Sequence, residues 1–160
     1  MRTIEGLPLG KGFRFALVVS KFNDFVTDRL QDGALAALTS AGVETGDITV
    51  LRVPGAFEIP SAARHAAATG TFQAVVCLGC LIRGATPHFE YISSAVSHGL
   101  TEAAGATGVP MTFGVLTTNS VEEALERAGD GRSNKGWEAA MAAVEMATLL
   151  SRITPARQLP

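Results

Sequence analysis

Short apolar segments alternate with helical patterns along most of this chain, and that alternation limits the fold more than any other feature of the sequence. The segments are rich in Val, Ile, Leu and Phe, and none of them alternates cleanly between polar and apolar residues. Strands of this composition suit the interior of a parallel sheet that helices cover on both faces. We therefore predict four strands, at residues 14–20, 48–53, 73–82 and 110–117.

The helical patterns lie between these strands and end at residues that commonly terminate helices. Gly42, Gly70 and Gly108 each follow such a pattern, and glycine is favoured just past a helix end. Ser120 and Glu123 have the spacing of a capping box at a helix start. The predicted helices span residues 25–41, 58–69, 89–106, 120 to about 128, and 136 to about 152. The alternation predicts an α/β fold, a three-layer α-β-α sandwich with a four-stranded parallel sheet and right-handed crossovers.

The composition is that of one folded domain and argues against nucleic acid and membrane as partners. The chain has 160 residues, 47% hydrophobic and 18% charged, which is enough apolar surface to offset the entropy lost on folding. A formal net charge of −2, without a dense Lys/Arg tract, argues against nucleic-acid binding. There is no apolar export segment and no run long enough to span a membrane, so we expect a soluble, cytoplasmic protein. Within the single domain, residues 1–12 are expected to form an extension and residues 154–160 a frayed tail.

Cys77 and Cys80 are the only cysteines and form a C-x-x-C pair, a pattern that can indicate redox or metal chemistry. Both lie in the third predicted strand, where an odd separation directs side chains to opposite faces. Neither a mutual disulfide nor a shared metal fits that geometry. We interpret both cysteines as small core residues.

Ligands of open parallel sheets bind beyond the carboxyl ends of the strands, so the four loops at that rim are the candidate site. Phe22 and Phe57 lie on turn-like segments, where each fits either a plug for the core or a stacking surface for a flat ring. Glu58 fits either a helix N-terminal charge or an acceptor for ligand hydroxyls. The rim loops comprise residues 20–24, 53–60, 82–88 and 116–120.

Polar groups on the later loops favour a small phosphorylated ligand. Backbone N–H groups around Thr86, at the start of a predicted helix, can gather a phosphate, and Arg127 can clasp one with its guanidinium fork. His88 fits either a helix-capping residue or an acid–base at neutral pH. Arg132 and Lys135 add charge near a Gly-rich turn, although such clusters are commonly solvated surface.

Five segments in this order resemble the lumazine synthase (6,7-dimethyl-8-ribityllumazine synthase) family: FNDFVTDRL, RVPGAFEIP, LGCLIRGATPHFEYI, GVLTTN and ERAGDGRSNKG. The resemblance covers roughly residues 13–152. It implies a flavodoxin-like sheet and the penultimate step of riboflavin synthesis. In that step a ribityl-aminouracil and a dihydroxybutanone phosphate condense to the lumazine, releasing phosphate and water. It implies no metal and no organic cofactor.

The resemblance also implies roles for individual residues. Phe22 stacks on the pyrimidine ring, and His88 transfers protons. The ring and ribityl chain are held by Ala56, Phe57 and Glu58, by the backbone of Cys80, Leu81 and Ile82, and by Phe113. The phosphate is bound by Ala85, Thr86 and Arg127, with Lys135 in support.

The family's assembly implies a site between neighbouring subunits of a pentamer, with Phe113, Arg127 and Lys135 supplied by the adjacent subunit. Small residues of the helix at 89–106 suit close packing around a five-fold axis. Some members stop at pentamers and others build sixty-subunit shells, which can associate with riboflavin synthase. The short loop at 129–135 favours a shell. Pro8 disfavours it, because proline removes a backbone donor from the family's inter-subunit strand pairing.

One departure from the family and two other functions follow from the same residues. Many relatives have a lysine in the phosphate-side loop where this chain has Gly131, followed by Arg132. The main alternative is a flavin-binding or storage module without catalysis, although residues 20–24 lack the phosphate cradle of a mononucleotide site. A shell protein without activity is the third interpretation. It is disfavoured by the match at four positions: Phe22, Glu58, His88 and Arg127.

Overall fold

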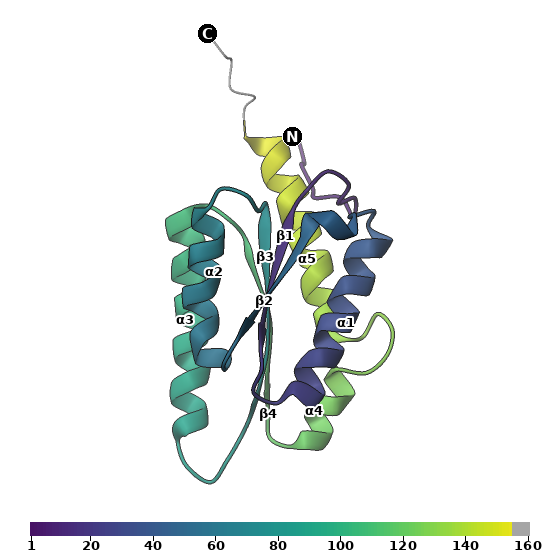
Figure 1. The fold of residues 1–160 in the computed structure, drawn as a ribbon. Helices are drawn as coiled ribbons and strands as arrows, with labels where there is room; N and C mark the ends of the chain where they lie inside the picture. The colour runs from purple at the N-terminus through teal and green to yellow at the C-terminus, as the bar shows by residue number, and fades with distance from the viewer. Residues whose placement is uncertain (155–160) are drawn as a thin grey trace.

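The computed structural model of the protein describes residues 1–154 and contains the predicted alternation of strands and helices (Figure 1). The expected frayed tail lies outside the described residues except for Thr154. None of the helices in residues 1–154 is long and apolar enough to cross a membrane. The elements are β1 (Phe15–Ser20), α1 (Asp24–Ser40), β2 (Ile48–Val53), α2 (Ile59–Ala68), β3 (Ala74–Ile82), α3 (His88–Thr107), β4 (Met111–Thr118), α4 (Val121–Arg127) and α5 (Lys135–Ile153), with short 3₁₀ helices at Thr45–Asp47 and Ala56–Glu58.

All four strands are parallel and lie in the order β2-β1-β3-β4. Helices α2 and α3 cover one face, and α1, α4 and α5 cover the other (Figure 1). The predicted three-layer α-β-α sandwich is therefore confirmed. Because the chain leaves β1 and β3 toward opposite faces, their carboxyl ends form the switch point at which doubly wound sheets bind ligands.

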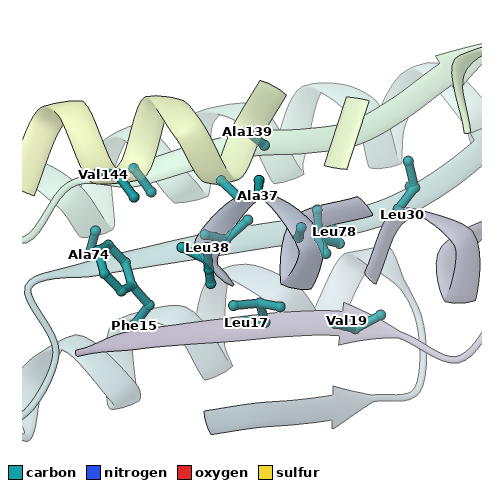
Figure 2. Packing of buried hydrophobic residues seen from close by; sticks show 14 of the residues in the cluster. Phe15, Leu17, Val19, Leu30, Ala37, Leu38, Ala74, Leu78, Ala139 and Val144 are labelled. Carbon is teal, nitrogen blue, oxygen red and sulfur yellow. The ribbon is translucent and has the colours of Figure 1, made fainter. Parts of the chain in front are cut away.

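Each face of the sheet has its own apolar core. Phe15, Leu17 and Val19 of β1 point toward α1 and α5 (Figure 2), while Ala16 and Val18 pack under α2 and α3. Strands buried on both faces explain why the sequence shows continuous apolar runs and no alternation.

The two cysteines lie on opposite faces of β3, as predicted. Cys77 packs under α2 and α3, and Cys80 packs toward α1 and α5. Both are buried free thiols. Burial raises the pKa of Cys80 to about 11 and that of Cys77 further, so both thiols stay protonated and unreactive at neutral pH.

Helix ends agree closely with the predicted signals. Gly108 ends α3 in the left-handed conformation with φ 70° and donates its N–H to Ala104 O, as a glycine after a helix can. At α4, the Ser120 hydroxyl accepts from Glu123 N as a capping box requires, but the Glu123 carboxylate accepts from Asn119 N. In a regular capping box the Glu123 carboxylate would accept from the N–H of Ser120, so this bond is displaced by one residue along the chain.

The N-terminal extension packs against α5 and the end of α1. Leu7 donates its N–H to the Thr148 hydroxyl (2.7 Å) and accepts a bond from it at its carbonyl (3.0 Å). Gly10 N–H donates to Ala41 O at 2.8 Å. The segment around Pro8 is thus held at both ends against α5 and the end of α1.

Candidate active site

A cavity of about 850 Å³ opens at the carboxyl ends of β1, β2 and β3. A volume in this range suits a small-molecule ligand. It brings together eight predicted site residues from three separate loops: Phe22, Ala56, Phe57, Glu58, Leu81, Ile82, Thr86 and His88.

Backbone hydrogen bonds carry the sheet pairing into the first two loops. Lys21 N–H donates to Val53 O (2.8 Å), and Phe22 N–H donates to Pro54 O (3.0 Å). Asn23 then takes a left-handed conformation with φ 61°, and its amide donates to Cys80 O at 2.9 Å. Phe22 is therefore fixed to β2 by its backbone and to β3 by its neighbour.

Exposed aromatic rings surround this cavity. Phe22 is 70% exposed, Phe57 63% and Tyr91 73%. Three exposed aromatic side chains around one cavity leave much apolar area in water, which burial against a ligand or a partner subunit would remove. A flat heteroaromatic ring fits such walls by stacking.

Glu58 and Cys80 are partly committed to local structure. Glu58 Oε2 accepts from Gly55 N–H at 3.1 Å, so the carboxylate caps the 3₁₀ turn while it lines the cavity. Cys80 is 1% exposed and does not line the cavity, and its carbonyl is occupied by Asn23. Ala85 also lies outside the lining, in the exposed turn between Gly84 and Thr86, which do line it.

His88 is the first residue of α3 and is exposed at the cavity wall. Pro87 takes the N-cap position of α3. Tyr91 and Ile92, three and four residues on, share the face of His88 and also line the cavity. His65 and His98 instead bond to Ser61 O and Ser94 O on their own helices.

Phe113, Arg127 and Lys135 line a different cavity of about 350 Å³, formed along β4 by α4 and α5. The two cavities share no lining residue. Arg127 donates to Glu123 O at 3.1 Å, and Lys135 Nζ pairs with Glu138 at 2.8 Å. Phe113 is 49% exposed on this edge strand of the sheet. Within one chain, Phe113, Arg127 and Lys135 are therefore separated from the predicted site residues that line the first cavity.

The loop before Lys135 is built around Asn134, which is 3% exposed. Its oxygen accepts from Gly136 N–H (2.8 Å) and Trp137 N–H (3.2 Å), and its amide donates to Arg29 O (3.1 Å) and Gly129 O (2.9 Å). Every polar atom of a buried amide is thereby satisfied. Asn134 thus fixes the start of α5 and the position of Lys135.

The departure from the family pattern, Gly131 followed by Arg132, lies in this loop. Gly131 has φ 80°, in the left-handed region that favours glycine. The Arg132 guanidinium lies 6.0 Å from the centroid of the Trp137 ring, in range of a cation–π contact. Arg132 does not line the cavity of Arg127 and Lys135.

Sequence reasoning missed several residues that line the large cavity. Tyr91 and Ile92 could have been found from helical spacing after His88. Asn23 carried no such signal, because a lone asparagine before a helix predicts a cap, and its side chain makes no capping bond. The missed residues are Asn23, Pro54, Gly55, Gly84, Phe89, Tyr91 and Ile92.

Charge and metal-ligand content of the site are modest. Within residues 1–154, no group of three or more His, Cys, Asp or Glu side chains is placed to hold a metal ion. What the site presents is aromatic surface, one carboxylate, one imidazole and backbone N–H groups before α3.

Comparison with known proteins points to one family. The family model described as 6,7-dimethyl-8-ribityllumazine synthase matches residues 12–151. A protein from Syntrophus aciditrophicus (strain SB), described as 6,7-dimethyl-8-ribityllumazine synthase, is 57% identical over 149 residues, which are 93% of this chain and 97% of that protein.

Proposed function

Because the chain belongs to the 6,7-dimethyl-8-ribityllumazine synthase family, we propose that it makes the lumazine precursor of riboflavin at the large rim cavity. It is a transferase that condenses 5-amino-6-(D-ribitylamino)uracil with 3,4-dihydroxy-2-butanone 4-phosphate, releasing phosphate and water. One observation supports placing the reaction in this cavity: Phe22, Glu58 and His88 come from three different segments of the chain and all line it.

The cavity suggests how the aminouracil is held. Phe22 and Phe57 are exposed and can cover the ring. Ala56, Leu81 and Ile82 complete the apolar lining, with Cys80 supporting it from behind. The Glu58 carboxylate accepts hydrogen bonds from the ribityl hydroxyls, using the lone pairs that are not engaged by the Gly55 N–H.

The butanone phosphate binds at the turn before α3. Backbone N–H groups of Ala85 and Thr86 and the positive end of the α3 dipole attract the dianion. His88 then lies beside both substrates and moves protons during imine formation and ring closure. The sequence of steps is attack of the primary amine on the ketone, loss of water to a Schiff base, elimination of phosphate, and closure of the second ring with loss of a second water. Most of the acceleration comes from holding two reactants together.

The complete site lies between subunits in this proposal. Members of the family act on small molecules and assemble as oligomers. Phe113, Arg127 and Lys135 of one subunit occupy a separate cavity, so a neighbouring copy can present them to the rim cavity, where they close over the ring and bind phosphate. We propose a cytoplasmic homopentamer of single 160-residue domains, able to build a sixty-subunit shell and to associate with riboflavin synthase.

Substituting His88 tests the proton-transfer role. We expect His88→Ala to lower kcat by about 10²-fold without abolishing turnover, because a positioned acid–base contributes in that range and substrate juxtaposition remains. Steady-state kinetics with both substrates measure this, and the control is His65→Ala, at an exposed position of α2 that does not line the cavity. An unchanged kcat for His88→Ala would remove His88 from the mechanism.

The activity itself is tested by mixing purified protein with both substrates and following lumazine absorbance and fluorescence. Product must form faster than in the uncatalysed mixture. Absence of acceleration, together with tight binding of a flavin, would instead support the flavin-storage alternative. Light scattering of the same sample separates a pentamer from a shell.

A further inference from the structure

Arg83 makes three side-chain contacts at the rim although it lines neither cavity described above. Its Nε donates to Asn119 Oδ1 at 2.9 Å, and its Nη1 donates to Glu90 Oε1. Its guanidinium also lies 4.6 Å from the centroid of the Phe89 ring. These partners come from the first turn of α3 and from the loop after β4, so one side chain connects two rim loops.

The turn enclosed by these contacts is the proposed phosphate site. Arg83 and Glu90 bracket residues 84–89, and their ion pair closes this segment into a ring. Residues 84–88 are all exposed, so packing contributes little to the shape of the turn. An added Cβ at Gly84 would meet nothing within 4 Å. The conformation of Gly84–Pro87 therefore depends on what holds its two ends.

Both ends of this clamp are themselves anchored. Arg83 N–H donates to Thr118 O at 2.8 Å, which extends the β3–β4 pairing, and Asn119 N–H donates to Glu123 Oε2 at 2.8 Å. The pKa of the Glu90 carboxyl is lowered below its usual range, first by a hydrogen bond from the Glu90 backbone and then by the Arg83 guanidinium. Desolvation acts in the opposite direction but does not outweigh them. Glu90 is thus ionised at neutral pH and its pair with Arg83 persists.

We propose that Arg83 is a positioning residue, which holds the turn Gly84–Pro87 and the start of α3 in the shape that receives the substrate phosphate and places His88. This inference rests on the proposed function. An exposed ion pair adds little to global stability, whereas small misplacement of binding groups costs catalysis heavily. The clamp therefore affects the site far more than the fold.

Kinetics of Arg83→Ala test the inference. We expect the KM for the butanone phosphate to rise about tenfold, the inhibition constant of inorganic phosphate to rise by a similar factor, and kcat to fall about tenfold. The KM for the aminouracil should change less than about twofold, because its walls lie on other loops. Arg14→Ala removes a comparable ion pair, with Asp47 at 3.5 Å, at the opposite end of β1, and should leave all four constants unchanged.

A second set of variants separates the two arms of the clamp. Arg83→Lys retains a cation for Glu90 but loses the planar fork that also reaches Asn119, so it should resemble Asn119→Ala. The double variant should then be no worse than either single one, which is the signature of a shared interaction.

The outcomes distinguish this inference from the assignment of function. Wild-type protein without turnover would overturn the function. If the wild-type protein is active, three results would overturn only the role of Arg83. Folded Arg83→Ala could keep the wild-type KM for the butanone phosphate and the wild-type inhibition constant of phosphate, or both KM values could rise together with a lower Tm. The third result is that the effects of Arg83→Lys and Asn119→Ala add independently.

Discussion

Mixed oligomers of His88→Ala and Arg127→Ala subunits should recover about a quarter of the wild-type activity, although each variant alone is nearly inactive. His88 lies at the rim cavity and Arg127 at the cavity along β4. If a neighbouring subunit supplies Arg127, random mixing leaves about one interface in four with both residues intact. Alone, His88→Ala should retain about 1% of kcat. Arg127→Ala should lose a comparable factor, mainly through weaker use of the butanone phosphate.

A matched pair of variants makes this experiment decisive. His88→Ala mixed with Phe22→Ala places both lesions on the rim cavity, so no site in those oligomers has both residues and activity should not recover. Subunits are mixed by unfolding two variants together and refolding them, and product fluorescence is followed at fixed total protein. Recovery in neither mixture would show that one subunit supplies both His88 and Arg127.

The fold could be predicted because local and long-range signals agree in this chain. Strand β2 was predicted at its observed bounds, β1 and β3 begin one residue later than predicted, and β4 is shifted by one residue. Runs buried on both faces predict parallel strands, and glycines such as Gly108 terminate the helices where expected. The hydrophobic pattern does not predict the strand order β2-β1-β3-β4. The order depends on the side of the preceding strand to which each helix returns the chain.

The candidate site was predictable in its residue types but not in its connections. Phe57, Glu58 and His88 follow strands in the sequence, so their meeting at the rim follows from a parallel sheet. Asn23 donating to Cys80 O and Arg83 donating to Asn119 join residues 57 and 36 positions apart. Such contacts depend on three-dimensional placement of loops, and no spacing rule along one segment reports them.

Gly136→Ala should lower the free energy of unfolding by about 3–5 kcal/mol, with a fall in Tm of roughly 10 °C. In most helices this substitution stabilises the protein by about 1 kcal/mol. Here an added Cβ would lie 1.9 Å from Leu30 O and 2.9 Å from Asn134 Oδ1. Since the first contact is with the backbone of α1, rotation of a side chain cannot relieve it, and α5 must move away.

Movement of α5 would affect both the packing of the core and the position of a site residue. Moving the start of α5 breaks the bonds that Asn134 makes to Arg29 O and Gly129 O, leaving a buried amide unsatisfied, which adds to the cost. It also moves Lys135, so activity at permissive temperature should fall with stability. Gly46→Ala is the control: Gly46 is an exposed residue of the 3₁₀ helix Thr45–Asp47, outside the helix proposed to pack around the five-fold axis, and an added Cβ there meets nothing within 4 Å. Denaturant unfolding at equal protein concentration should show Gly46→Ala unchanged or more stable by up to about 1 kcal/mol. Equal stability of Gly136→Ala and wild type would mean that α1 and α5 are less closely packed at Leu30 than the structure indicates.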